Sequence, residues 1–174
     1  EVADADSAPA LASTVTLTYS GAASGSLTAT PGALTYFTTT GTYTITVSGP
    51  YTFLIRAIAA GGAGRPSSGP SGNGGGGGGS GSYTTGTNVT LIPGKTYTLV
   101  IPPAVTSGTN GAALTLVNTT DTVTMISLGG GLSGSASVAG CVGGTAATGS
   151  GLVNGQTGGT GSTEAVGGST VGAS

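Results

Sequence analysis

The segment from Gly61 to Ser82 most constrains what this chain can fold into, because it reads GGAGRPSSGPSGNGGGGGGSGS. It has no apolar side chain larger than proline or alanine, so it cannot build a hydrophobic core. Glycine also loses more conformational entropy than any other residue when it becomes ordered. The segment is therefore either a flexible linker or a structure in which only glycine fits.

A three-residue period among the glycines favours the ordered alternative. Every third position from residue 69 to residue 81 is glycine. Of the fifteen positions counted in threes from Gly131 to Ala173, nine are glycine, whereas the sixteen glycines of residues 129–174 spread over three phases would place about five there. Three residues per turn is the period of the polyproline II helix, and such helices can pack closely when glycine faces inward. We predict a bundle of short polyproline II segments, with a disordered Gly/Ser-rich linker and tail as the alternative.

Elsewhere apolar and hydroxylated residues alternate, which indicates strands with one apolar face. No segment has a helical apolar stripe, so we predict an all-β protein. The expected fold is an antiparallel β-sandwich, jelly-roll-like, whose glycine-rich loops pack as polyproline II segments. The stretch 51–59, YTFLIRAIA, is apolar on both faces and is predicted to be a central strand, with Arg56 reaching solvent. Strands are predicted over residues 13–19, 26–30, 34–40, 42–48, 51–59, 83–92, 95–101, 112–117 and 122–128.

The chain divides into three parts on this reading. Residues 1–12 carry three of the five acids and form an extended N-terminal arm, either mobile or laid onto a neighbouring subunit. Residues 13–128 form the sandwich with the glycine-rich insertion at 61–82, and residues 129–174 form a glycine-rich C-terminal segment. Both glycine-rich stretches leave strand ends, so we expect them to meet at one end of the sandwich. Because residue 1 is Glu and no leader precedes it, we also expect a processed or trimmed chain.

The composition excludes most site chemistry. The chain has no histidine, which removes Ser-His-Asp catalysis and histidine metal sites, and Cys141 alone can form neither an intramolecular disulfide nor a cysteine metal site. Three scattered cations cannot make a basic patch, so nucleic acid is not an expected partner. No run of eighteen apolar residues is present to span a membrane. We therefore expect that the protein is not an enzyme and that it has no catalytic residues, no cofactor and no bound metal.

Four stretches follow one another in a recognisable order: an apolar strand running into glycines, a strand after a glycine run, a PGKTYT hairpin and a second glycine-rich block. They occupy residues 51–62, 74–85, 93–98 and 129 onward. Over about residues 42–174 this order resembles the glycine-rich domain of phage tail-fibre and other virion surface proteins. The resemblance implies polyproline II bundles at a fibre tip, where exposed loops touch host receptors. Two departures from the family pattern are Pro102-Pro103 after the hairpin and the lack of aromatic residues in 129–174, which favours a structural role over receptor binding.

The expected function is therefore a non-enzymatic phage virion surface structural protein, extracellular on the virion. It would be a capsid decoration or minor capsid protein or a fibre subunit, with a host-receptor adhesin as a further form. Charged residues make up 5% of the chain and its mean hydropathy is +0.30, so much of the surface should be covered in an assembly. Expected partners are copies of itself, with a trimer as the expected homo-oligomer, other virion proteins, and a host surface glycan or protein. The candidate exposed binding loop comprises Arg65, Ser67, Ser68, Asn73, Asn154 and Gln156.

Threonines at every second position motivate a different hypothesis. They occur at residues 14, 16 and 18, at 42, 44 and 46, at 96 and 98, and at 122 and 124. Flat threonine faces resemble those of ice-binding proteins, so the alternative is a secreted ice-binding or bacterial cell-surface protein. Threonine is also a favourable residue on the solvent face of a strand, and twisted strands do not align into one plane. The virion reading is preferred for that reason.

Overall fold

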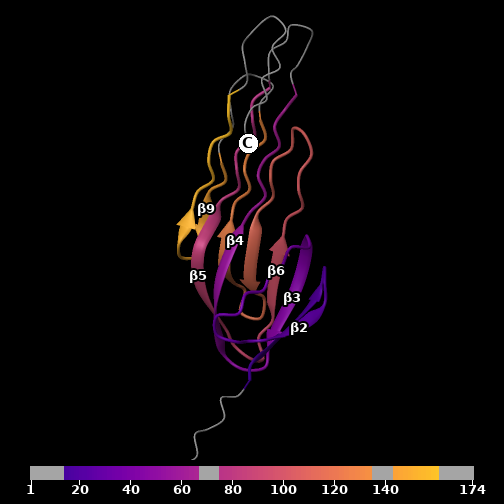
Figure 1. Ribbon diagram of the computed structural model, residues 1–174, viewed down its shortest axis with the longest axis vertical. Helices are drawn as coiled ribbons and strands as arrows, with labels where there is room; N and C mark the ends of the chain where they lie inside the picture. The colour runs from indigo at the N-terminus through magenta and orange to yellow at the C-terminus, as the bar shows by residue number, and fades with distance from the viewer. Residues whose placement is uncertain (1–13, 67–74, 135–142, 161–174) are drawn as a thin grey trace, which may run out of the picture.

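The computed structural model describes residues 14–66, 75–134 and 143–160, and within these ranges all regular structure is β (Figure 1). Every strand pairing is antiparallel, so the predicted all-β, antiparallel class is confirmed. The strands are β1 (Thr16–Gly21), β2 (Gly25–Thr28), β3 (Gly41–Val47), β4 (Tyr51–Ile58), β5 (Tyr83–Leu91), β6 (Tyr97–Ile101), β7 (Leu114–Asn118), β8 (Val123–Leu128), β9 (Ala146–Thr148) and β10 (Leu152–Val153).

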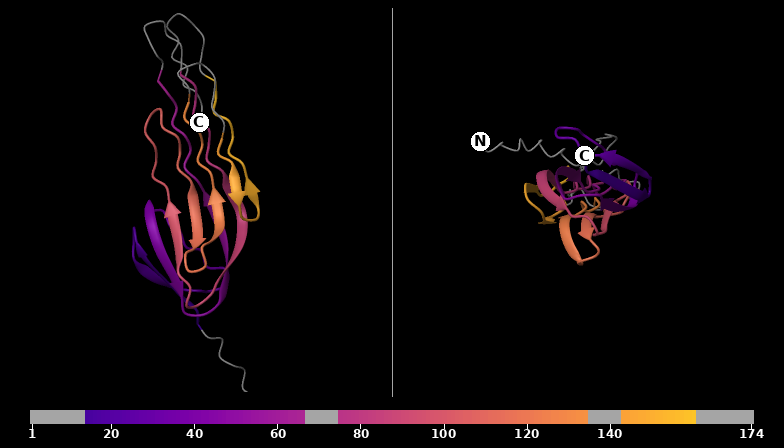
Figure 2. Two further views of the ribbon diagram at one scale, coloured as in Figure 1. Left: turned by 180° about the vertical axis from the view of Figure 1, so that it is seen from behind. Right: turned by 90° about the horizontal axis from the view of Figure 1, so that it is seen from below.

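The strands form two sheets of unequal size. The large sheet has the order β2-β1-β3-β6-β7-β8-β9, and the small sheet has the order β10-β5-β4. Seen from below, the strands are arranged around a shared interior (Figure 2). The core consists of the inward residues of both sheets: Leu17, Tyr43, Ile45, Val47, Ala59, Val89, Leu91, Tyr97, Leu114, Leu116, Ile126 and Leu128.

The period-two pattern explains which residues enter this core. In β3, Tyr43, Ile45 and Val47 are buried, while the threonines between them face solvent. Successive side chains of a strand point to opposite faces, so the alternating sequence buries one row and exposes the other. By the same rule Tyr97 of β6 is buried in the core, where its hydroxyl accepts a hydrogen bond from the Ile92 amide at 2.8 Å.

The strand predicted over 34–40 is wrong, because this stretch makes no ladder. Phe37 nevertheless packs against the core, in edge-to-face contact with Tyr19 at 5.0 Å and Tyr43 at 5.2 Å between ring centroids. Its neighbours Leu34 and Tyr36 are 80% and 77% exposed. The alternation in this stretch therefore places one aromatic ring against the large sheet, but the backbone of the stretch does not pair with a strand.

The prediction that 51–59 is a central strand is also wrong. β4 is the edge strand of the small sheet, and Leu54 and Ile58 on its outer face are 61% and 63% exposed. The apolar residues on the outer face of β4 therefore do not mean that a second layer packs on that face. They are exposed to solvent. Arg56 lies exposed on that same face, as predicted. The sequence reading also missed β9 and β10, which lie within the glycine-rich tail.

Candidate functional site

Beyond one end of the sheets, six extended segments without regular strand or helix structure run side by side (Figures 1 and 2). We call them the glycine bundle. One row of three continues the small sheet, since it follows β4, precedes β5 and follows β10. A second row lies between β6 and β7, after β8 and before β9, and so continues the large sheet. The bundle comprises residues 59–66, 75–82 and 154–160 in the first row, and 104–111, 129–134 and 143–145 in the second.

The segment 75–82 hydrogen-bonds to four others, and its partners recur every third residue. The carbonyls of Gly76, Gly79 and Ser82 accept from the amides of Arg65, Gly62 and Ala59, at 3.2, 2.8 and 2.9 Å. On a second side, the amides of residues 79 and 82 donate to the carbonyls of residues 132 and 129. On a third side, the amides of residues 77 and 80 donate to the carbonyls of residues 159 and 156. The carbonyl of residue 80 also accepts from the amide of residue 144 at 2.8 Å, so the backbone bonds both within its row and across to the other row.

Close backbone approach explains why glycine occupies every third position. A Cβ added at Gly75, Gly78 or Gly81 would lie closer than 3.0 Å to a backbone carbonyl oxygen of the segment 59–66. Real Cβ atoms essentially never approach backbone that closely, so the position admits only glycine. The same holds in the second predicted register, where the blocked glycines are Gly131, Gly134, Gly143, Gly155 and Gly158.

Three of the predicted binding-loop residues lie in the described part of the chain. Arg65, Asn154 and Gln156 are all exposed. Arg65 and Gln156 stand on opposite sides of the segment 75–82, because the first belongs to 59–66 and the second to 154–160. They therefore come from different segments of the bundle. Ser67, Ser68 and Asn73 lie outside the described residues.

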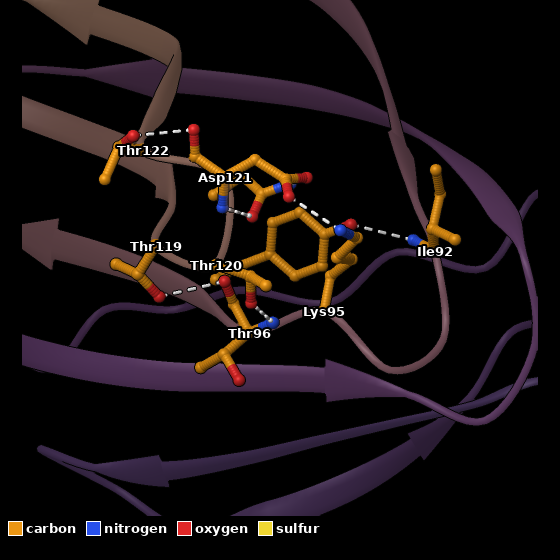
Figure 3. Close-up of polar contacts among 9 residues, drawn as sticks. Ile92, Lys95, Thr96, Thr119, Thr120, Asp121 and Thr122 are labelled. Carbon is orange, nitrogen blue, oxygen red and sulfur yellow. Dashed lines mark hydrogen bonds and ion pairs between the residues drawn. The ribbon is translucent and has the colours of Figure 1, made fainter.

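A polar cluster joins two turns at the opposite end of the sheets (Figure 3). Lys95 Nζ lies 2.6 Å from Asp121 Oδ1, and Asn118 Nδ2 donates to Asp121 Oδ2 at 2.9 Å. The Thr96 amide donates to Thr120 Oγ1 at 2.8 Å. The hydrogen bond from Lys95 lowers the pKa of the Asp121 carboxyl below its ordinary value. These groups satisfy one another, so the cluster fastens the β5–β6 turn to the β7–β8 turn.

The outer face of the large sheet is rich in hydroxyl groups. Thr44 lies opposite Ser20 on β1 and Thr98 on β6, and Thr98 lies opposite Val117. Thr42, Thr44 and Thr46 are all exposed. The threonine alternation seen in the sequence therefore becomes a shared face across neighbouring strands.

An apolar groove lies at the bundle end of β4, and sequence reasoning missed it. It has a volume of about 430 Å³ and is bounded by residues 58–63 on one side and 101–105 on the other. The groove lies where the segment after β4 of the small sheet runs past the segment after β6 of the large sheet, and strand order is not encoded in local alternation. Pro102-Pro103 was the available signal, since proline ends β6 and turns the chain away from the ladder.

Residues 14–66, 75–134 and 143–160 contain no group of three acidic, histidine or cysteine side chains that could hold a metal ion. Over the same residues, no helix is long and apolar enough to cross a membrane. No protein family, curated protein or solved structure matches this chain.

Proposed function

We propose that this chain is a non-enzymatic phage virion surface structural protein whose sheets form the attached base and whose glycine bundle projects outward. The observation that carries the proposal is the bundle, in which six segments are tied in two rows by backbone hydrogen bonds. Such a unit is built from backbone groups, which provide few reactive side chains but hold a fixed shape. That suits a spike, a decoration protein or a fibre subunit better than an enzyme.

The direction of the chain supports this orientation. The β1 residue Leu17 pairs with Val47, the last residue of β3, whereas Gly41 at the start of β3 pairs with Ile101, next to the bundle. Residues before β1 therefore join the sheets at the end remote from the bundle. A chain attached to a particle through the end of the sheets at which β1 begins would present the bundle to the exterior.

We further propose that the bundle segments are polyproline II helices and that the two sheets form a jelly-roll-like sandwich. The three-residue recurrence of hydrogen-bond partners along 75–82 supports the first statement, because polyproline II has three residues per turn. The chain crosses from the large sheet to the small one after β3 and returns after β5, which supports the second. Circular dichroism and amide exchange test the helices: slow exchange at residues 76–82 is expected, and exchange at random-coil rates would contradict them.

The test of the virion assignment is direct recovery from particles. Mass spectrometry of phage particles purified from cells that carry the gene should detect this chain in stoichiometric amounts. An antibody raised against residues 154–160 should label the particle surface, while one against the turn 118–122 should label intact particles weakly. Particles that lack the chain would overturn the proposal. Sedimentation of the purified chain tests the proposed homo-oligomer, for which a trimer is expected.

The hydroxyl face of the large sheet favours a second candidate, an ice-binding or bacterial cell-surface protein. Its central residue Thr44 is flanked by hydroxyl groups on both neighbouring strands. Thermal hysteresis that is lost in Thr44→Tyr and kept in Thr90→Tyr, a matched exposed threonine on the small sheet, would favour it. Absence of hysteresis at millimolar protein would remove it.

A further inference from the structure

The free edge of β4 has the properties of a strand-docking site. β4 pairs with β5 on one side, and no strand of the described chain pairs with its other side. An unpaired edge exposes a row of backbone N–H and C=O groups that can accept another strand. Leu54 and Ile58 add exposed apolar area to this edge.

The groove at the bundle end of β4 extends this surface with apolar lining. All of its lining residues are nonpolar: Ile58, Ala59, Ala60, Gly61, Gly62, Ala63, Ile101, Pro102, Pro103, Ala104 and Val105. Beyond these residues, hydrogen bonds between 59–66 and 104–111 close the groove, from the Ala63 amide to the Thr109 carbonyl at 3.0 Å and from the Gly108 amide to the Gly64 carbonyl at 3.3 Å. A strand docked on β4 could therefore not continue past these residues into the bundle.

The end of β4 remote from the bundle is where the N-terminal segment joins the sheets. The Ser48 amide donates to the Thr16 carbonyl at 2.9 Å, and the Thr16 amide donates to Ser48 Oγ at 2.9 Å. A Cβ at Gly49 would lie 3.1 Å from Val15 Cγ2. β4 begins at Tyr51, two residues after Gly49. The segment that precedes Thr14 therefore joins the sheets close to the first residue of β4.

Charge at the edge is complementary to that segment. Arg56 is exposed in β4. Within the described residues the ion pair is formed by Lys95 and Asp121, and Arg56 does not take part in it. Residues 1–12 contain Glu1, Asp4 and Asp6 and no cation. Twelve residues in extended form reach about 40 Å, which exceeds the roughly 26 Å of an eight-residue strand.

We propose that residues 1–12, the acidic arm, dock along the free edge of β4 as an additional antiparallel strand of the small sheet. This follows independently of the virion assignment. Continuing the pairing of Leu17 with Val47 in steps of one places Asp6 opposite Ile58, diagonal to Arg56, and Leu11 opposite Phe53. Diagonal neighbours on adjacent strands lie within reach of long side chains. Leu11 then packs toward the core beside Phe53, and the arm covers the apolar edge.

The test is amide exchange of residues 51–58 in the full chain. We expect these amides to exchange about two- to fivefold faster in Asp4→Lys/Asp6→Lys, the range for loss of an exposed ion pair. The same rise is expected in Arg56→Glu, and combining all three changes should restore slow exchange. Glu1→Lys is the matched control, because in this register residue 1 lies opposite residue 63 and is the farthest of the three acids from Arg56. Leu11→Asp should give the largest rise, with the thermal unfolding midpoint of the sheets retained.

Two outcomes overturn the proposal. Identical exchange of residues 51–58 in the parent chain and in both charge-reversed variants would show that the arm does not dock there. Sedimentation velocity over a range of concentrations identifies the source of the strand. Protection of β4 that appears only as dimers form would assign the edge to a second copy instead of the chain's own arm.

Discussion

The sheets and the glycine bundle bury their backbones against different kinds of neighbour. In the sheets, hydrogen bonds run within each layer and side chains such as Ile126 and Leu128, both fully buried, fill the space between layers. In the bundle, hydrogen bonds run both within and between the rows, as from the Gly131 amide to the Ala60 carbonyl at 3.0 Å. No Cβ fits between the rows at positions such as Gly131. One region is therefore sensitive to losing atoms and the other to gaining them.

Removing atoms from the sheet core should have the largest effect. Ile126 is a fully buried residue of β8, and Ile126→Ala leaves a cavity in place of its side chain. The substitution should lower the free energy of unfolding by about 2–5 kcal/mol. Chemical denaturation monitored by tyrosine fluorescence measures the change. Thr124→Ala, an exposed residue of the same strand, is the control and should change stability by less than about 0.5 kcal/mol.

Adding one methyl group to the bundle should have the next largest effect. In Gly78→Ala the new Cβ meets the Gly62 carbonyl, and overpacking of this kind destabilises by about 1–3 kcal/mol. Amide exchange of residues 76–82 should accelerate more than that of β7 and β8. The matched control is Gly64→Ala in the same bundle, whose Cβ would stand 3.7 Å from its nearest neighbour. Equal losses in both variants would contradict the close-approach account.

Loss of one hydrogen bond at the boundary between the two regions should have a smaller effect. Ser82 is fully buried, and its hydroxyl donates to the Gly129 carbonyl at 3.1 Å. Ser82→Ala removes that donor but keeps the Ser82 amide bond to the same carbonyl. We expect a loss of about 1 kcal/mol in the free energy of unfolding, measured by denaturation. Ser82→Thr, which keeps the hydroxyl but adds a methyl group to a filled site, separates the hydrogen bond from packing.

The smallest effect should come from the exposed cluster around Asp121. Lys95 lowers the pKa of this carboxyl in the folded state, so the stabilisation is complete above the unfolded pKa and is lost as pH falls through the folded pKa. The difference in urea midpoint between the parent chain and Asp121→Asn should therefore shrink as pH is lowered from 7 toward 2. Lys95→Met should remove the same pH-dependent component. A difference that stays constant with pH would show that the ionised Asp121 carboxylate adds nothing to stability.

Local patterns in the sequence predicted several features of the fold correctly. Alternation located the buried row of β3 and the buried Tyr97 of β6, and the absence of a helical stripe gave the all-β class. The alternation at 34–40 did not give a strand, because a strand also needs a neighbouring backbone with which to pair. The site was less predictable: the candidate binding residues Arg65 and Gln156 are exposed, but no local pattern showed that the segment 75–82 lies between them. The groove between residues 58–63 and 101–105 lies between segments that follow strands of two sheets, and no local pattern contains that arrangement.

Alone, the sequence determined where glycine is required and where apolar side chains face inward, because both depend on periods of three and two along one chain. The tertiary structure decided which backbone each glycine approaches, that β4 lies at an edge, and that two rows of extended segments prolong two sheets. Those outcomes rest on pairings between residues as distant as Ser80 and Gln156. Chain entropy opposes such contacts, and many simultaneous backbone hydrogen bonds offset that entropy only in the assembled fold.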